Sequence, residues 1–270
     1  MSLKVILAGA LAGSMLFLTG CQSSLTPSDT TLPPEEEKNP VVEAIDSSEF
    51  KYPASNEDFY YHVYDKFIYI TKYLGGSQEK VVVPDTIEGL PVYSMGPAAF
   101  KSADIQEISI SKNVTYFHDE LFADCINLKT VTFTDVKDIP EGVVPGNGIC
   151  ETGRNVFAGC VSLANIELPD SMIYIGDYFF YGCSSLKKIA IPSQITSIPT
   201  GMFEGCAELK EIHIGEQVTS IAQNAFAGVP ETVCFYGTEY SAAAVFAAEN
   251  FYRFVVTKAE ITPEQEGSTT

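Results

Sequence analysis

Apolar and polar residues alternate in short runs that recur along the middle of the chain. The runs Ile166–Leu168, Ile189–Ile191 and Ile212–Ile214 each place one polar or small residue between two apolar residues. Alternation of this kind predicts a short β-strand with one buried face. A leucine lies three residues before each run, and a proline or glycine follows it directly. We therefore expect one short strand in each of several similar units.

A phenylalanine marks the opposite side of the same unit. Successive phenylalanines lie 22, 35, 23, 23 and 23 residues apart, and the step of 35 exceeds the usual 23 by 12 (35 − 23). We infer an insertion at about residues 138–153. One unit of this size cannot bury its own apolar face, whereas stacked units share a continuous core. The period predicts an α/β solenoid of the leucine-rich repeat class, with about six units of roughly 23 residues. The marking residues are Phe100, Phe122, Phe157, Phe180, Phe203 and Phe226.

The detailed spacing resembles the BspA-type leucine-rich repeat family. Its first half is carried by segments such as Phe180-Tyr181-Gly182-Cys183 and Phe203-Glu204-Gly205-Cys206, each followed by a leucine and then a strand. The second half is carried by Ile173–Gly176 and Ile195–Pro199, and the likeness spans roughly residues 80–240. The resemblance implies a solenoid, a place on a bacterial surface and, in some members, adhesion to host or partner-cell molecules. It does not imply one ligand.

Four cysteines, Cys125, Cys160, Cys183 and Cys206, occupy one equivalent position of the repeat. Equivalent positions of a solenoid stack at about the strand spacing of 4.7–4.9 Å. Because free cysteine behaves as a small, readily buried hydrophobe, we predict that this column belongs to the core. A disulfide between stacked members is the alternative, and no histidine joins the column to make a metal site.

Both ends of the predicted solenoid carry segments that can cover its open core. Residues 50–79 predict an N-terminal β-hairpin cap, with strands at Asp58–Val63 and Phe67–Thr71. At the other end, Ser241–Asn250 predicts a helix that Ser241 caps, and Phe251–Val256 predicts a last strand. The solenoid with this C-terminal cap spans residues 80–258, and the polar residues 259–270 predict a disordered tail.

The first residues have the composition of an export signal. Lys4 precedes the apolar stretch Val5–Leu18, and we assign residues 1–20 to a lipoprotein signal peptide. Leu18-Thr19-Gly20-Cys21 resembles the lipobox of bacterial lipoproteins, which implies lipidation of Cys21 and an acyl anchor in the membrane. A plain signal peptide with a chance cysteine is the alternative. Residues 21–49 are rich in proline, serine and glutamate and predict a flexible tether, so we expect an exported cell-surface lipoprotein.

The formal net charge of −19 argues against nucleic-acid binding, because such a surface repels phosphate backbones. Catalysis needs converging groups, but His62, His118 and His213 fall in the cap, an early repeat and a late strand, apart along a rod. The sequence has no nucleophile elbow, zinc-protease motif or phosphate-binding glycine loop. We therefore predict that the protein is not an enzyme and needs no cofactor or metal.

Two groups of side chains are candidates for binding an extracellular protein or glycan. Amphipathic rings of the cap make good contacts if packing leaves them exposed, although packing alone also explains them. Outward strand positions and the insertion suit a binding surface, and they equally suit a solvated face and an inert loop. An envelope spacer without a diffusible ligand is the alternative function, and an extracellular hydrolase is a third. The candidates are Tyr52, Tyr60, Tyr61, Tyr64 and Tyr69 in the cap, and Glu107, Thr132, Glu167, Lys188, Glu211 and His213 on the strands.

Overall fold

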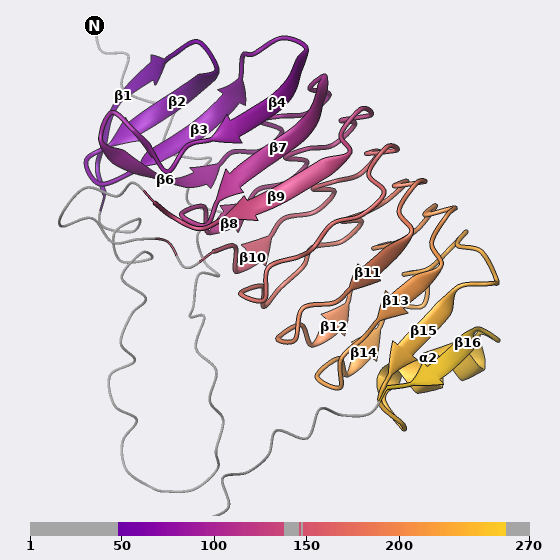
Figure 1. Cartoon of the computed structure of the whole chain (residues 1–270). Coiled ribbons are helices and arrows are strands. Elements are labelled where there is room, and N and C mark those ends of the chain that lie inside the picture. The colour runs from indigo at the N-terminus through magenta and orange to yellow at the C-terminus, as the bar shows by residue number, and fades with distance from the viewer. Residues whose placement is uncertain (1–47, 138–145, 147, 258–270) are drawn as a thin grey trace, which may run out of the picture.

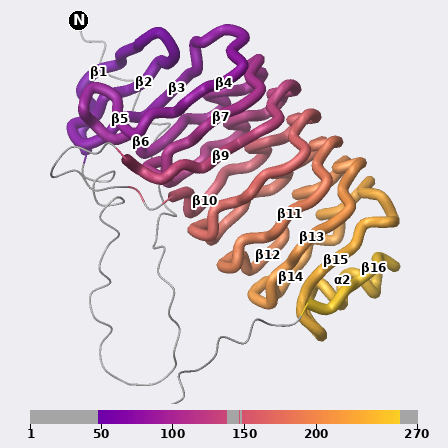
Figure 2. Tube along the Cα trace, in the orientation of Figure 1, coloured from indigo at the N-terminus to yellow at the C-terminus, as the bar shows by residue number. Residues whose placement is uncertain are grey.

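The computed structural model describes residues 48–137, 146 and 148–257 of the chain. Over this range the chain winds into a β-solenoid of about eight turns, which confirms the predicted leucine-rich repeat fold (Figures 1 and 2). The structure therefore has more turns than the six predicted from the marking phenylalanines. The predicted signal peptide, the lipidated Cys21, most of the tether, the centre of the insertion and the tail lie outside the described residues.

The first strand of each turn contributes to one side of the solenoid, which we call the first sheet. It consists of a three-stranded part and a four-stranded part, and every pairing in it is parallel. The predicted strands at 189–191 and 212–214 are confirmed as β11 and β13. The prediction of a strand at 166–168 is wrong, because the segment 165–168 between the two parts has only a single bridge, from Asn165 to Lys188. The strands are β4 (Gln78–Val83), β7 (Ile105–Ser111), β9 (Thr130–Thr134), β11 (Lys188–Ala190), β13 (Glu211–His213), β15 (Cys234–Gly237) and β16 (Arg253–Val256).

The second strand of each turn contributes to the other side, the second sheet, which ends in the N-terminal cap. Here β1, β2 and β3 pair antiparallel, and β3 then continues in parallel pairing through β6 and β8 to β10. The predicted hairpin is confirmed as β2 and β3. Sequence alternation did not reveal β1, because it contains Pro53 and is exposed at most positions, as an edge strand tolerates. The strands are β1 (Phe50–Ser55), β2 (Phe59–Tyr64), β3 (Ile68–Tyr73), β5 (Thr86–Ile87, paired with β6), β6 (Leu90–Met95), β8 (Tyr116–Phe117), β10 (Glu151–Thr152), β12 (Ser197–Ile198) and β14 (Ser220–Ile221).

The marking phenylalanines form a ladder that runs through the core. The ring centroids of successive members lie between 5.1 and 5.8 Å apart, and no member is more than 2% exposed. Contacts at these separations are those of packed aromatic pairs. The ladder crosses the insertion without a break, because the rings of Phe122 and Phe157 stack at 5.2 Å. The segments that carry the ladder phenylalanines form hydrogen-bonded turns rather than helices. In the described part of the chain, helix is therefore confined to the C-terminal cap.

The cysteine column lies beside the ladder and is buried, as predicted. Each thiol donates a hydrogen bond to the carbonyl oxygen of the ladder phenylalanine in the preceding turn. The sulfur–oxygen distance is 3.0 Å from Cys125 to Phe100 and 3.3 Å from Cys206 to Phe180. Burial raises the pKa of the Cys125 and Cys206 thiols to about 12, so they remain protonated donors. The four members are free thiols, and the alternative disulfide between them does not form.

The helix α2 (Ala242–Glu249) closes the C-terminal end, as predicted. The hydroxyl of Ser241 accepts a hydrogen bond from the backbone N–H of Ala244 at 3.3 Å and so caps the helix. Phe246 covers the last ladder ring, with its centroid 5.4 Å from that of Phe226. In the described part of the chain, no helix has the length and apolar character that a membrane span requires.

Truncating one ladder ring should destabilise the fold strongly. Phe203 is fully buried between Phe180 and Phe226, so we expect Phe203→Ala to lower the free energy of unfolding by about 3–5 kcal/mol. Urea unfolding measures this change. Phe251→Ala is the matched control, because Phe251 is 93% exposed, and its effect should stay within about 0.5 kcal/mol. Equal stability of the two variants would show that the buried side of the repeat is wrongly assigned.

Candidate functional site

The outward side of the second sheet carries a continuous chain of ring contacts, which we call the aromatic face. The ring centroid of Phe50 on β1 lies 5.3 Å from that of His62 on β2. His62 lies 6.1 Å from Tyr69 on β3, and Tyr69 lies 5.6 Å from His118, next to β8. Strand pairing thus brings together residues from distant parts of the sequence. The aromatic face consists of the residues in ring contact, Phe50, His62, Tyr64, Tyr69, Tyr116 and His118, together with Tyr60, which projects from the same side of β2.

Alternation within β2 explains why these rings face outward. Phe59, Tyr61 and Val63 are buried in the core, so the intervening side chains lie on the other side of the sheet. Tyr60 is 49% exposed and Phe50 is 52% exposed, whereas the other members are partly covered by their neighbours. The aromatic face therefore combines rings that are held in place with rings that solvent can reach.

The five candidate tyrosines of the cap divide between two sides. Tyr60, Tyr64 and Tyr69 belong to the aromatic face. The prediction that Tyr61 is available for binding is wrong, because it is 3% exposed and points into the core. The hydroxyl groups of Tyr61 and Tyr52 both donate hydrogen bonds of 2.8 Å to the carboxylate of Glu88, so Tyr52 also lies away from the aromatic face.

Two of the three histidines meet on the aromatic face, which corrects the expectation that all three lie apart. His62 and His118 both contact Tyr69, whereas His213 stacks on Tyr236 of β15 in the first sheet, with centroids 4.5 Å apart. Sequence reasoning missed His62, His118 and Tyr116 as partners because five further strands, β3 to β7, lie between β2 and β8 in the chain. The sequence signal that could have found them is alternation, because each of these residues lies next to a buried strand residue and therefore faces outward.

The neighbours of His118 hold its ring in the neutral form. Tyr69 and Tyr116 enclose it, with centroid distances of 5.6 and 4.6 Å. Burial lowers the pKa of His118 to about 4, and the negative charge of Asp119 only partly opposes this shift. At neutral pH the His118 ring therefore carries no charge and acts as part of an aromatic surface.

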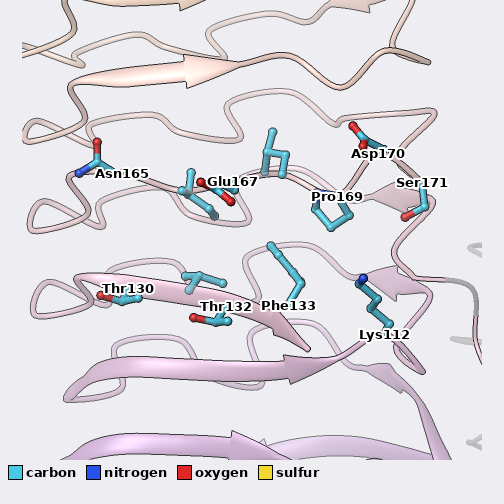
Figure 3. A pocket seen from close by; sticks show the side chains of 12 residues that line it. Lys112, Thr130, Thr132, Phe133, Asn165, Glu167, Pro169, Asp170 and Ser171 are labelled. Atoms are coloured by element: carbon cyan, nitrogen blue, oxygen red, sulfur yellow. The ribbon is translucent and has the colours of Figure 1, made fainter. Parts of the chain in front are cut away.

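A second candidate surface is a groove of about 600 Å³ in the first sheet, between β9 and the segment 165–168 (Figure 3). No backbone hydrogen bond between described residues joins these two segments. Thr132 and Glu167, both predicted as binding candidates, line the groove from opposite sides. Phe133 and Leu168 add half-buried apolar side chains, so the groove combines polar edges with an apolar interior.

The groove lies where the insertion leaves the stack of turns. The backbone N–H of Lys137 donates to the carboxylate of Asp85 at 2.9 Å, and the N–H of Gly148 donates to the carbonyl of Lys112 at 2.8 Å. The hydroxyl of Ser111 also donates to Asp85. These bonds hold both ends of the insertion against preceding turns. In the described part of the chain, the space between β9 and the segment 165–168 therefore remains open as the groove.

The remaining strand candidates stay at the surface but do not converge. Glu107 forms an ion pair with Lys80 at 2.8 Å, so its charge is already matched. Lys188 and Glu211 are exposed and in register on β11 and β13. In the described part of the chain, no group of three or more histidine, cysteine or acidic side chains could hold a metal ion.

Comparison with protein families matches residues 141–236 to the BspA type leucine rich repeat region, in six copies. Residues 141–236 are therefore similar to BspA-type leucine-rich repeats. The BspA-type region includes one edge of the groove at residues 165–168. Every member of the aromatic face lies before it, between residues 50 and 118.

Solved structures resemble this solenoid as well. A leucine-rich repeat protein of T. pallidum is 24% identical, with a TM-score of 0.53, over 76% of this chain and 98% of that chain. A leucine rich cell surface protein of Faecalibacterium prausnitzii A2-165 is 26% identical, with a TM-score of 0.56, over 72% of this chain. The matched part is 53% of that protein, so the chain spans about half of its length. No curated protein matches the chain.

Acid should destabilise the protein through His118. Unfolded histidine titrates near pH 6.5 and His118 in the folded state near 4, so the unfolded chain binds more protons between these values. The contribution of neutral His118 to the free energy of unfolding is fully present above about pH 6.5 and is lost as the pH falls towards 4. We expect His118→Gln to lose less free energy of unfolding than the wild type between pH 7 and 5.

Urea unfolding at the two pH values measures this difference, and the comparison cancels the titration of carboxylates common to both proteins. His213→Gln, on the first sheet, is the control and should behave like the wild type. The same pH-dependent loss in His118→Gln as in the wild type would contradict the role assigned to burial of His118.

Proposed function

We propose that the protein is an exported, lipid-anchored surface protein that binds an extracellular protein or glycan through the aromatic face, without catalysis. The observation that carries this proposal is the unbroken chain of ring contacts from Phe50 to His118. Aromatic rings contribute most strongly to binding when their conformations are fixed before the partner arrives. Ring-to-ring packing across paired strands supplies that fixation.

The composition of the aromatic face supports binding, and Tyr64 and Tyr69 also pack against the buried Phe67 and Tyr93. The outward side of a sheet can be polar without loss of core burial, as alternating antiparallel sheets show. Here it presents tyrosine and histidine, whose rings are amphipathic and suit both sugar rings and protein side chains. The printed name of the F. prausnitzii relative, a cell surface protein, supports a place outside the cell.

Binding to immobilised ligands tests this function. We expect the purified protein to bind saturably to at least one member of an array of matrix proteins and glycans, at low and high salt. Replacing the two most exposed rings in Phe50→Ser/Tyr60→Ser should weaken that binding by at least about tenfold, because anchor residues dominate binding energy.

Tyr240→Ser is the matched control, because Tyr240 is 88% exposed but lies beside α2 at the opposite end. It should bind like the wild type. Equal losses of affinity in both variants would show that exposed rings contribute only non-specific hydrophobic binding. If the wild type binds no member of the array, the result would favour the envelope spacer instead.

Lipid anchoring rests on Leu18–Cys21 and has its own test. Cells that express the protein and are fed a labelled fatty acid should yield acylated protein in the membrane fraction. Cys21→Ser should abolish the label and release the protein from that fraction, because the acyl chains supply the membrane affinity. Membrane retention of an unlabelled Cys21→Ser protein would contradict the acyl anchor.

A further inference from the structure

A carboxylate lies between two tyrosines in one row across the second sheet. Glu151 of β10 is in register with Tyr116 of β8 on one side, and a parallel bridge joins it to Tyr174 on the other. Residues in register on parallel strands point to the same side, so the three side chains project outward together. Burial raises the pKa of Tyr116, and the charges of Asp119 and Glu151 raise it further, which reflects how close these groups lie.

Glu151 has no partner in the described part of the chain. It is half-buried, and no described residue forms a hydrogen bond or an ion pair with its carboxylate. Burial by itself raises the pKa of this carboxyl group. The next basic residue along the chain, Arg154, pairs instead with Asp177 at 3.7 Å. Partial burial of an unpaired carboxylate costs free energy, which a cation bound from outside would recover.

The spacing of the row fits a small cationic group. Neighbouring strands lie about 4.8 Å apart, which places Tyr116 and Tyr174 about 9.6 Å from each other across Glu151. A cation over Glu151 would lie between the two strands that carry the tyrosines, each about 4.8 Å away. Tyrosine rings that project beside it can come within the roughly 6 Å range of cation–π attraction. Tyr174 is 53% exposed, so the row is open to solvent on that side.

We propose that Tyr116, Glu151 and Tyr174 form a site for a cationic group, presented by a lysine or arginine side chain of a partner protein. This inference rests on the proposed function, since Tyr116 belongs to the aromatic face, and it names the partner's chemistry. The net charge of −19 would attract a basic protein from a distance. A neutral sugar would leave the carboxylate without a counter-charge, and an acidic glycan would be repelled.

Titration with simple cations tests the site. The probes are oligolysine, oligoarginine, tetramethylammonium and its neutral isostere 3,3-dimethylbutanol, and the readout is the NMR signals of tyrosine rings in the purified protein. Tyr116→Phe and Tyr174→Phe assign the two relevant signals. We expect oligolysine, oligoarginine and tetramethylammonium to shift both signals and the neutral isostere to shift neither.

Substitution of the carboxylate separates the site from general charge attraction. Glu151→Gln should weaken oligolysine binding by about tenfold to a hundredfold, the range for loss of a bond to a charged group. Glu208→Gln removes the same charge from an exposed position elsewhere and should bind like the wild type. Equal affinity of the two variants would overturn the site. Shifts with tetramethylammonium but with neither peptide would overturn the choice of a protein side chain.

The failures of the two proposals are distinguishable. If the Phe50→Ser/Tyr60→Ser variant loses an array partner while Glu151→Gln binds oligolysine normally, the binding function stands and the cation site falls. If the array yields no partner but Glu151→Gln alone loses oligolysine, the cation site stands and the proposed function falls.

Discussion

Stacking of equivalent residues between neighbouring turns is the constraint on which the whole structure depends. A 23-residue turn has too little apolar surface to bury itself, so each ladder ring needs a ring above and below. Phe180 has both, at 5.8 Å from Phe157 and 5.8 Å from Phe203. The thiol of Cys183 adds a hydrogen bond of 3.1 Å to the carbonyl of Phe157. Ring stacking and the thiol bond together fix the register of successive turns, and the strands pair where that register places them.

The insertion shows how much of this constraint can be relaxed. The ladder stays continuous across it, from Phe122 to Phe157, and the second sheet also continues, from β8 to β10. Only the first sheet opens, between β9 and residues 165–168. The phenylalanine ladder and the second sheet together are enough to keep the following turns in place. The opened sheet therefore becomes a groove without ending the solenoid.

The repeat allowed the solenoid and the buried cysteine column to be predicted from the sequence, because both depend on positions that recur. The caps were predicted from local patterns instead, a hairpin at one end and a helix capped by Ser241 at the other. The aromatic face was only partly predictable. Tyr60 and Tyr61 are both aromatic and adjacent, so alternation alone does not say which one faces the core. His62 and His118 lie 56 residues apart (118 − 62), and only the pairing of β3 with β6 and β6 with β8 brings them to one surface. Strand β1 lacked a pattern because its contacts are those of an exposed edge.

The outward positions of the second sheet do not take part in stacking, so the fold leaves their identity open. At 23-residue steps, Glu151 is followed by Tyr174, Ser197 and Ser220, which means that the exposed ring gives way to small hydroxyls along the rod. Exposed rings add apolar surface without adding core burial, and such surface is normally kept small unless it binds something. On the second sheet, the rings at these outward positions gather in the turns nearest the N-terminus. The segment from Cys21 to Phe50 can span at most about 100 Å, so an anchored molecule would present this surface to partners within that distance of the membrane.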